Sequence, residues 1–352
     1  MKIEKFYLPF TRHGVLTFAF ALAAGLAFTA CSDDEDGDGG GGSAGGSSEA
    51  GVVTGEDGEK LYLKSAGDTY FSYDENGRVT SVREGSYSGA DVYEFTYNPF
   101  TVTNKYEGSD GSMTYTLSGI SINKSGYITK VKETVIDEYY GETETSVANA
   151  SLSYDGAGHL TKMSVSGKVS GTEDGEKYSY NASSSYVFTW SGGKLTKAKW
   201  TANVGGEKET ETTVFEYDEN QYPNITKQYT GFIDDVTEDL EFAFLLGYMG
   251  KGPDYHPTAC ELTSEYDGEK DVDSYSYSYV LNSNGSVKRV GYSYNGGSTF
   301  WSDFTYYNAS DFGSGDASYV PFKAPSKEAK PRMSIAKKFS QKVRVLRAKN
   351  RK

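Results

Sequence analysis

Hydrophobic and polar residues alternate along most of the chain between residues 58 and 320. The segments 93–97 (Tyr-Glu-Phe-Thr-Tyr) and 198–204 (Ala-Lys-Trp-Thr-Ala-Asn-Val) show this period of two clearly. Such a period is typical of strands that bury one face and leave the other in water. The pattern therefore predicts an all-β protein.

A short unit recurs within this alternation. In its 152–163 copy it reads Leu-Ser-Tyr-Asp-Gly-Ala-Gly-His-Leu-Thr-Lys-Met, and a shorter copy stands at 215–220. The aromatic residue ends one strand, Asp or Asn accepts hydrogen bonds in the turn, and Gly adopts the positive φ of a tight loop. In the 152–163 copy the turn glycine is Gly158. In other copies it is Gly77, Gly126, Gly193 and Gly285.

These hairpins follow one another at intervals of about one hairpin and its return, which predicts a long antiparallel meander. A sheet of many strands curves or closes, because raw edges pair with other chains. We therefore expect a curved, barrel-like sheet over residues 58–322. Its number of strands, and whether it closes, do not follow from the pattern.

Residues 235–247 break the period of two. Asp235 and Glu238 form a capping box, and Gly247 stops the helix that the pattern predicts. Its apolar stripe consists of Val236, Leu240, Ala243 and Phe244. We expect this stripe to pack against the concave side of the sheet.

Residues 1–30 are expected to be an export signal. A cationic start precedes the apolar run 15–30, which is too short for a membrane-spanning helix of about 20 residues. The sequence Phe28-Thr-Ala-Cys31 resembles the lipobox of bacterial lipoproteins, which implies that Cys31 is acylated and anchors the chain in the outer membrane. The alternative is an ordinary signal peptide that ends by chance at a cysteine.

An acidic cluster follows the anchor and opens a Gly/Ser-rich tether, 31–57. It resembles the surface-export signal of Bacteroidetes-type lipoproteins, which implies exposure on the cell surface; the alternative is a simple flexible linker. The cluster consists of Ser32, Asp33, Asp34, Glu35 and Asp36.

Charge is segregated along the chain. The chain has 35 Lys/Arg and 49 Asp/Glu residues. The two terminal segments, 1–30 and 323–352, together contain 15 of the Lys/Arg and 2 of the Asp/Glu residues. The residues between them therefore carry a net charge of −27. Such a body repels phosphate, so we expect no nucleic-acid partner. The basic tail, 323–352, is interpreted as docking on the acidic body or on anionic lipid headgroups, or as a solvated tail.

The hairpin motif, the acidic leader and the element Leu-Leu-Gly-Tyr-Met-Gly-Lys-Gly-Pro at 245–253 together resemble a family of Bacteroidetes-type lipoproteins. That family is a domain-of-unknown-function family described as having a porin-like fold. The hairpins also resemble the YD repeats of toxin-shell proteins. The resemblance covers roughly residues 58–320 and implies a fold and an outer-membrane location, but no activity. Because the polar face is dense in charge, we expect a barrel that does not span the membrane and has its aromatic face inward.

No motif assigns a reaction. Cys260 and His256 are too poorly aligned for a catalytic nucleophile pair. The turn role of the Asp residues already explains the Asp-rich turns without calcium, and we expect no metal and no cofactor. The preferred interpretation is a surface binding or scaffold module whose ligand is a glycan or another cell-surface ligand. The tyrosines of 275–279 and 292–294 are candidates for a glycan platform; the alternative is that they are the buried positions of alternating strands. The alternative is an extracellular hydrolase acting on polysaccharide, which requires two carboxylates in one pocket. The oligomeric state does not follow from the sequence.

Overall fold

The computed structural model describes residues 52–311 apart from 57, 86–90, 109–110, 140–141, 174, 205–206, 219–221, 231–240, 267–268 and 309. One sheet of seventeen strands contains every strand of this region. The export signal, Cys31, the acidic cluster 32–36 and the basic tail lie outside the described residues.

The strands are β1 (Val52–Thr54), β2 (Lys60–Ala66), β3 (Thr69–Tyr73), β4 (Val79–Glu84), β5 (Asp91–Tyr97), β6 (Phe100–Gly108), β7 (Gly111–Ile122), β8 (Ile128–Tyr139), β9 (Glu142–Tyr154), β10 (Leu160–Glu173), β11 (Glu176–Ser191), β12 (Lys194–Val204), β13 (Glu207–Glu216), β14 (Ala259–Tyr266), β15 (Glu269–Leu281), β16 (Val287–Tyr294) and β17 (Phe300–Asn308). β1 lies within the segment that the sequence predicted to be a tether.

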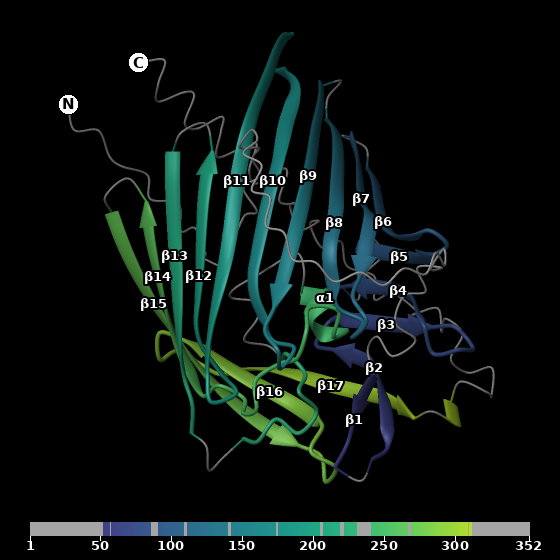
Figure 1. Ribbon diagram of the computed structural model, residues 1–352, viewed down its shortest axis with the longest axis vertical. Coiled ribbons are helices and arrows are strands. Elements are labelled where there is room, and N and C mark those ends of the chain that lie inside the picture. Colours follow the sequence, from purple (N-terminus) through teal and green to yellow (C-terminus); the bar gives the residue numbers. More distant parts are fainter. Residues whose placement is uncertain are drawn as a thin grey trace, which may run out of the picture.

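The sheet closes into a barrel of sixteen antiparallel strands, β2–β17 (Figure 1). Each strand pairs with its neighbour in the sequence, and β17 pairs with β2, with Phe304 opposite Ala66. β1 is an additional strand that pairs with β2. The predicted all-β, barrel-like meander is confirmed.

The hairpin turns at one end of the barrel have the predicted chemistry. The turn glycines Gly77, Gly126, Gly158, Gly193 and Gly285 have φ values from 72° to 93°. In the turn before Gly158, Oδ1 of Asp155 accepts hydrogen bonds from the backbone N–H groups of Ala157 and His159, both at 2.9 Å. Asp74 and Asn123 cap their turns in the same way.

The copy of the unit at 215–220 does not make a hairpin, and its interpretation as a further repeat was wrong. β13 ends at Glu216, and the next strand, β14, begins only at Ala259. Gln221 stands where the other copies have their turn glycine, and Pro223 cannot donate to a sheet ladder. The chain therefore leaves the sheet here.

The segment between β13 and β14 folds into the barrel, and we call its described residues, 222–230 and 241–258, the plug. It contains α1 (Glu241–Leu245), which lies inside the curve of the long strands (Figure 1). The predicted helix covered 235–247; its predicted start lies outside the described residues. Phe244 is fully buried and Leu245 is 1% exposed, so the helix serves as core, as expected.

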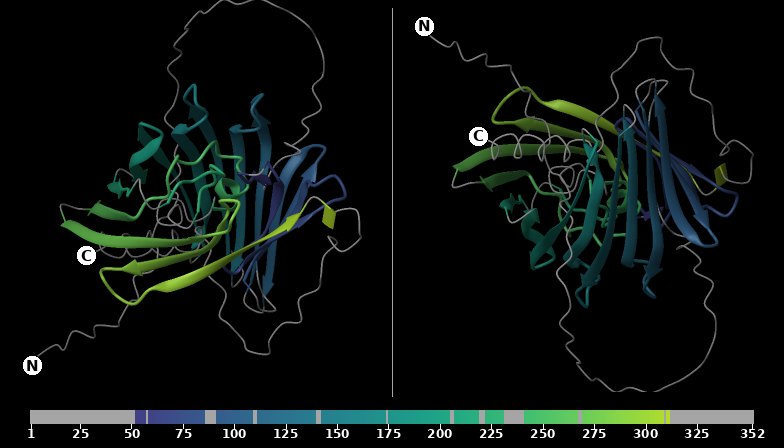
Figure 2. Two further views of the ribbon diagram at one scale, coloured as in Figure 1. Left: turned by 90° about the horizontal axis from the view of Figure 1, so that it is seen from below. Right: turned by 90° about the horizontal axis from the view of Figure 1, so that it is seen from above.

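The plug is fixed at the end of the barrel where the glycine turns lie. The backbone N–H of Ile128 donates to Tyr248 O at 2.9 Å, and Asp254 N donates to Gly193 O at 2.7 Å. The two further views also show the plug enclosed by strands (Figure 2). The hairpins that join β8 to β9 and β10 to β11 lie at the other end, which we call the hairpin-tip end.

Part of the outer face of the barrel is polar. One row of directly paired residues runs across the outside of β7–β13 and contains no apolar side chain: Ser118, Lys132, Asn149, Ser166, Ser183, Asn203 and Lys208. A lipid-facing barrel has an apolar band there, and a single Lys at its middle costs about 2–4 kcal/mol. Other outward positions of these strands are apolar and exposed, among them Ile136, Val187 and Val214. None of the described helices is long and apolar enough to cross a membrane.

Candidate functional site

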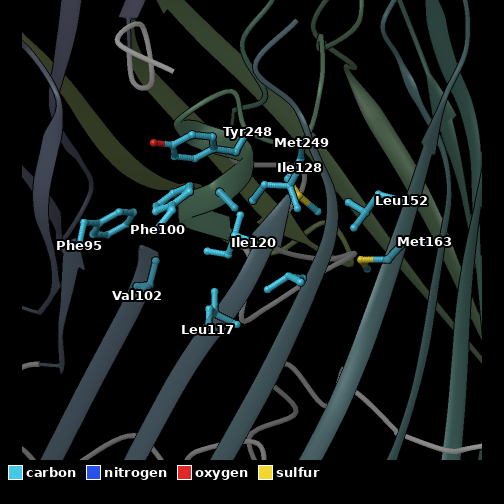
Figure 3. A pocket seen from close by; sticks show the side chains of 12 residues that line it. Phe95, Phe100, Val102, Leu117, Ile120, Ile128, Leu152, Met163, Tyr248 and Met249 are labelled. Carbon is cyan, nitrogen blue, oxygen red and sulfur yellow. The ribbon is translucent and has the colours of Figure 1, made fainter. Parts of the chain in front are cut away.

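A small apolar pocket lies where the plug meets the wall of the barrel (Figure 3). Tyr248 and Met249 of the plug face Phe100, Ile128 and other apolar residues of the strands. The cavity measures about 20 Å³, which is room for about one water molecule. It is a packing gap and not a ligand site.

Carboxylates occupy the inner face beyond the plug. Strand register decides this, because directly paired residues share a face. Val131 and Val135 are buried in the core, so Glu133 and Asp137 on the same strand also point inward. By the same rule further carboxylates point inward, and we use the name inner carboxylates for nine of them: Glu84, Asp91, Glu133, Asp137, Glu144, Glu209, Glu211, Asp271 and Asp273.

Most inner carboxylates lie toward the hairpin-tip end of the barrel. Asp137 is two residues from the end of β8, and Glu144 is two residues from the start of β9. Glu209 stands similarly near the start of β13, and Asp271 near the start of β15. The barrel therefore has two inner regions: the plug at the turn end, and an acidic region toward the hairpin tips.

Positive charge is absent from the inner face of the long strands. On the described residues of β6–β15, register places every Lys outside: Lys132 pairs with Asn149 while its neighbour Glu133 pairs with Ala148. Lys199 faces outward beside the buried Trp200 in the same way. The inner face of these strands therefore carries carboxylates without Lys, whereas the outer face carries Lys together with carboxylates such as Glu138.

Tyrosine and serine hydroxyls support the inner carboxylates. Tyr294 Oη donates to Asp273 Oδ1 at 2.5 Å, and Tyr178 Oη donates to Glu144. Ser264 Oγ donates to Glu211 Oε1 at 3.3 Å. The inner face thus offers oriented acceptors together with aromatic rings.

Glu133 differs from an ordinary surface glutamate. Burial raises the pKa of its carboxyl to about 8, and a hydrogen bond from Tyr115 opposes that rise. Its directly paired neighbours are Leu117 and Ala148, both apolar. The environment of Glu133 therefore favours the protonated carboxyl more than an exposed position does.

Register also brings like charges face to face. Glu84 lies directly opposite Asp91, and Asp137 lies directly opposite Glu144. Like charges in directly opposite positions destabilise a sheet. The inner face thus concentrates negative charge.

Two polar groups on the inner face are deeply buried. Trp200 and Ser184 are each 4% exposed. Within the part of the chain that the structure describes, neither Trp200 Nε1 nor Ser184 Oγ has a hydrogen-bond partner. Trp200 is directly paired with Glu211, so this donor stands beside an inner carboxylate.

The tyrosines suggested by the sequence as a glycan platform are mostly interior. Tyr277 and Tyr279 are buried, and Tyr275 shares their face. Tyr292 is 36% exposed and stacks on Phe300 with ring centroids 5.6 Å apart. The string on β15 therefore lines the inside of the barrel.

Cys260 and His256 take different partners. Cys260 is buried, with its Sγ 3.2 Å from Tyr277 Oη. His256 Nδ1 lies 3.0 Å from Thr230 Oγ1, and its ring stacks on Tyr279. Both side chains hold the core together where the plug meets β14 and β15. Across the described residues, no group of three or more His, Cys, Asp or Glu side chains is placed to hold a metal ion.

Sequence reasoning missed the inner carboxylates. The alternation was interpreted as aromatic residues inside and charged residues outside, which holds near the turns and fails near the hairpin tips. The signal was present: Asp137 is in phase with Val131 and Val135.

The chain matches no protein-family model and no curated protein. Solved structures similar to it include porin-like proteins from Bacteroides vulgatus ATCC 8482 and Bacteroides uniformis ATCC 8492. Both are 16% identical to this chain, cover 73% of it and give a TM-score of 0.39. The alignments span 97% and 95% of those two chains.

Proposed function

We propose that the protein is a lipid-anchored binding module of the outer-membrane surface, and that its ligand is a glycan bound at the acidic inner face of the barrel. The observation that carries this proposal is the charge division of the wall, with Asp137 and Glu144 inside and Lys132 outside. Cys31 is the proposed anchor, and the acidic cluster after it is the proposed surface-export signal.

The inner face favours sugars that bear amino groups. Carboxylates accept hydrogen bonds from hydroxyl and ammonium groups, and charge-assisted bonds are the stronger kind. Rings such as Tyr178 and Tyr180, which stack with centroids 6.1 Å apart, add flat apolar surface. A glucosamine oligomer supplies hydroxyls, ammonium groups and ring faces together.

The test is calorimetric titration of the mature full-length chain with a glucosamine hexamer at pH 6 and low salt. We expect the hexamer to bind, and its fully N-acetylated counterpart to bind at least ten times more weakly. Asp137→Asn together with Glu144→Gln should weaken binding at least tenfold.

The matched control is Glu138→Gln, which removes a carboxylate from the outer face of the same strand. It should leave the dissociation constant unchanged. Equal losses in the inner and outer variants, or no binding of the hexamer, would contradict the proposal.

The second candidate is a hydrolase acting on polysaccharide. Glu133 favours it, because a carboxyl with a pKa of about 8 holds the proton that a general acid donates. A glycosidase needs a second carboxylate nearby, whereas Glu133 has Leu117 and Ala148 directly opposite. Binding is therefore preferred. Release of reducing ends from the hexamer, abolished by Glu133→Gln, would establish the hydrolase instead.

A further inference from the structure

The inner carboxylates and the C-terminal tail have complementary charge. The tail, residues 323–352, contains twelve Lys/Arg and a single acid, Glu328. We propose that this tail binds inside its own barrel, against the inner carboxylates. It would thereby occupy the same surface that the proposed ligand uses.

The first argument is electrostatic. Asp137 faces Glu144 and Glu84 faces Asp91 across paired strands, while the lysines of β6–β15 in the described region lie outside. A concave surface of one charge attracts the opposite charge strongly, because its walls exclude water and focus the field. The basic tail belongs to the same molecule, so its effective concentration at this surface is high.

The second argument is the sequence of the tail itself. Ile335, Phe339, Val343 and Leu346 recur at helical spacing and form one apolar stripe, with lysines and arginines between them. The partly buried rings of Tyr178 and Tyr180, which stack with centroids 6.1 Å apart, offer this stripe apolar surface. Glu144, which accepts a hydrogen bond from Tyr178, offers the cations a carboxylate beside these rings.

The connection is long enough. β17 ends at Asn308, and residues 309–322 precede the tail. An extended stretch of that length spans up to roughly 45 Å. A twelve-residue strand such as β8 is roughly 40 Å long. The tail therefore reaches the hairpin-tip end from the end of β17.

The tail and the proposed ligand share the inner carboxylates, so the tail is an intramolecular competitor. The inference builds on the proposed function in this respect only, because tail binding needs no glycan. A failure of glycan binding alone leaves the tail inference standing.

Zero-length cross-linking of the mature full-length chain with a carbodiimide tests the proposal without any glycan. The reagent joins a lysine amine to a carboxylate that contacts it. We expect links within one chain from Lys337, Lys338 or Lys342 to Asp137 or Glu144. The yield of these links should be at least ten times the yield of links to Glu138. It should decrease in 0.5 M NaCl, which screens charge.

Asp137 and Glu138 are adjacent, face opposite sides of the wall and therefore form a matched pair. Equal links to both, links only between chains, or no tail links would overturn the proposal. Tail-dependent sedimentation with phosphatidylglycerol vesicles, combined with no links to the inner carboxylates, would assign the tail to lipid headgroups and overturn it too.

A second measurement uses stability. Lys337→Gln, Lys338→Gln and Lys342→Gln, combined in the full chain, should lower the thermal midpoint by several degrees at low salt. The control combines Lys132→Gln, Lys168→Gln and Lys208→Gln on the outer face and should leave the midpoint unchanged. Equal midpoints for the tail variant and the wild type would contradict tail binding.

Discussion

The carbonyl oxygen of Gly158 accepts a hydrogen bond from the backbone N–H of Lys251 at 2.9 Å. A hairpin turn of the wall is thereby joined directly to the plug. Gly250 precedes Lys251, and a Cβ at Gly250 would lie 2.5 Å from that same oxygen. The turn and the plug approach each other this closely only because residue 250 has no side chain.

Gly250→Ala should therefore destabilise the protein more than left-handed strain alone explains. Gly247 is the matched control, because it also has a positive φ, 75° against 93°, but open space around its Cβ position. We expect Gly247→Ala to cost about 1–2 kcal/mol, and Gly250→Ala clearly more. Urea unfolding measures both, and equal losses would contradict the close approach.

The stability of the protein should fall as pH rises through the titration of Glu133. Its pKa is raised from 4.5 to about 8, so between these values the folded state keeps a proton that the unfolded state has released. The unfolding free energy therefore decreases with rising pH in this window. Glu133→Gln should remove this decrease. Denaturant unfolding at pH 5 and pH 8 measures it, and identical pH dependence in wild type and variant would refute it.

His256 should make the protein less stable as pH falls, whereas Glu133 makes it less stable as pH rises. Burial, with a smaller effect of Lys227, lowers the pKa of its imidazole from 6.5 to about 3. Between these values the unfolded state binds a proton that the folded state excludes, so stability falls as pH falls. Each pKa unit corresponds to about 1.4 kcal/mol, so the full effect is a few kcal/mol at most. His256→Gln should lose less stability than wild type between pH 6.5 and pH 4.

The anchor is tested by Cys31→Ala. This variant should not be acylated and should leave the membrane fraction. A variant that remains in the membrane pellet would contradict the lipoprotein interpretation.

The acidic cluster is tested by replacing Asp33, Asp34, Glu35 and Asp36 with Ala. Acylation should persist, while protease added to whole cells should no longer cleave the protein. Cleavage as efficient as in wild type would mean that the cluster is only part of a linker.

The hairpins were predictable because their signals are local. Gly126 and Gly158 each follow a residue whose side chain caps the turn, and both have the positive φ that the pattern required. The period of two then fixed which residues of each strand share a face. Local propensity and the final structure agree at these positions.

Closure and the plug were not predictable in the same way. No pattern near β2 indicates that its partner is β17, and the unit at 215–220 resembles a hairpin except for Gln221. The grouping of the inner carboxylates depends on closure and on the plug. Which carboxylates lie opposite one another on paired strands is known only from the register. That they share a face with residues such as Val135 is visible in the sequence.

The seam between β2 and β17 joins residues from opposite ends of the barrel sequence. Ser65 Oγ and Thr305 Oγ1 lie 2.7 Å apart across it, although 240 positions separate them. Until β17 has been synthesised, β2 and β16 each present an open edge, and open edges recruit other chains. Such distant pairing also slows folding. Folding of the barrel is therefore completed by its last strand, and a chain truncated before residue 300 would keep two open edges and be prone to aggregate.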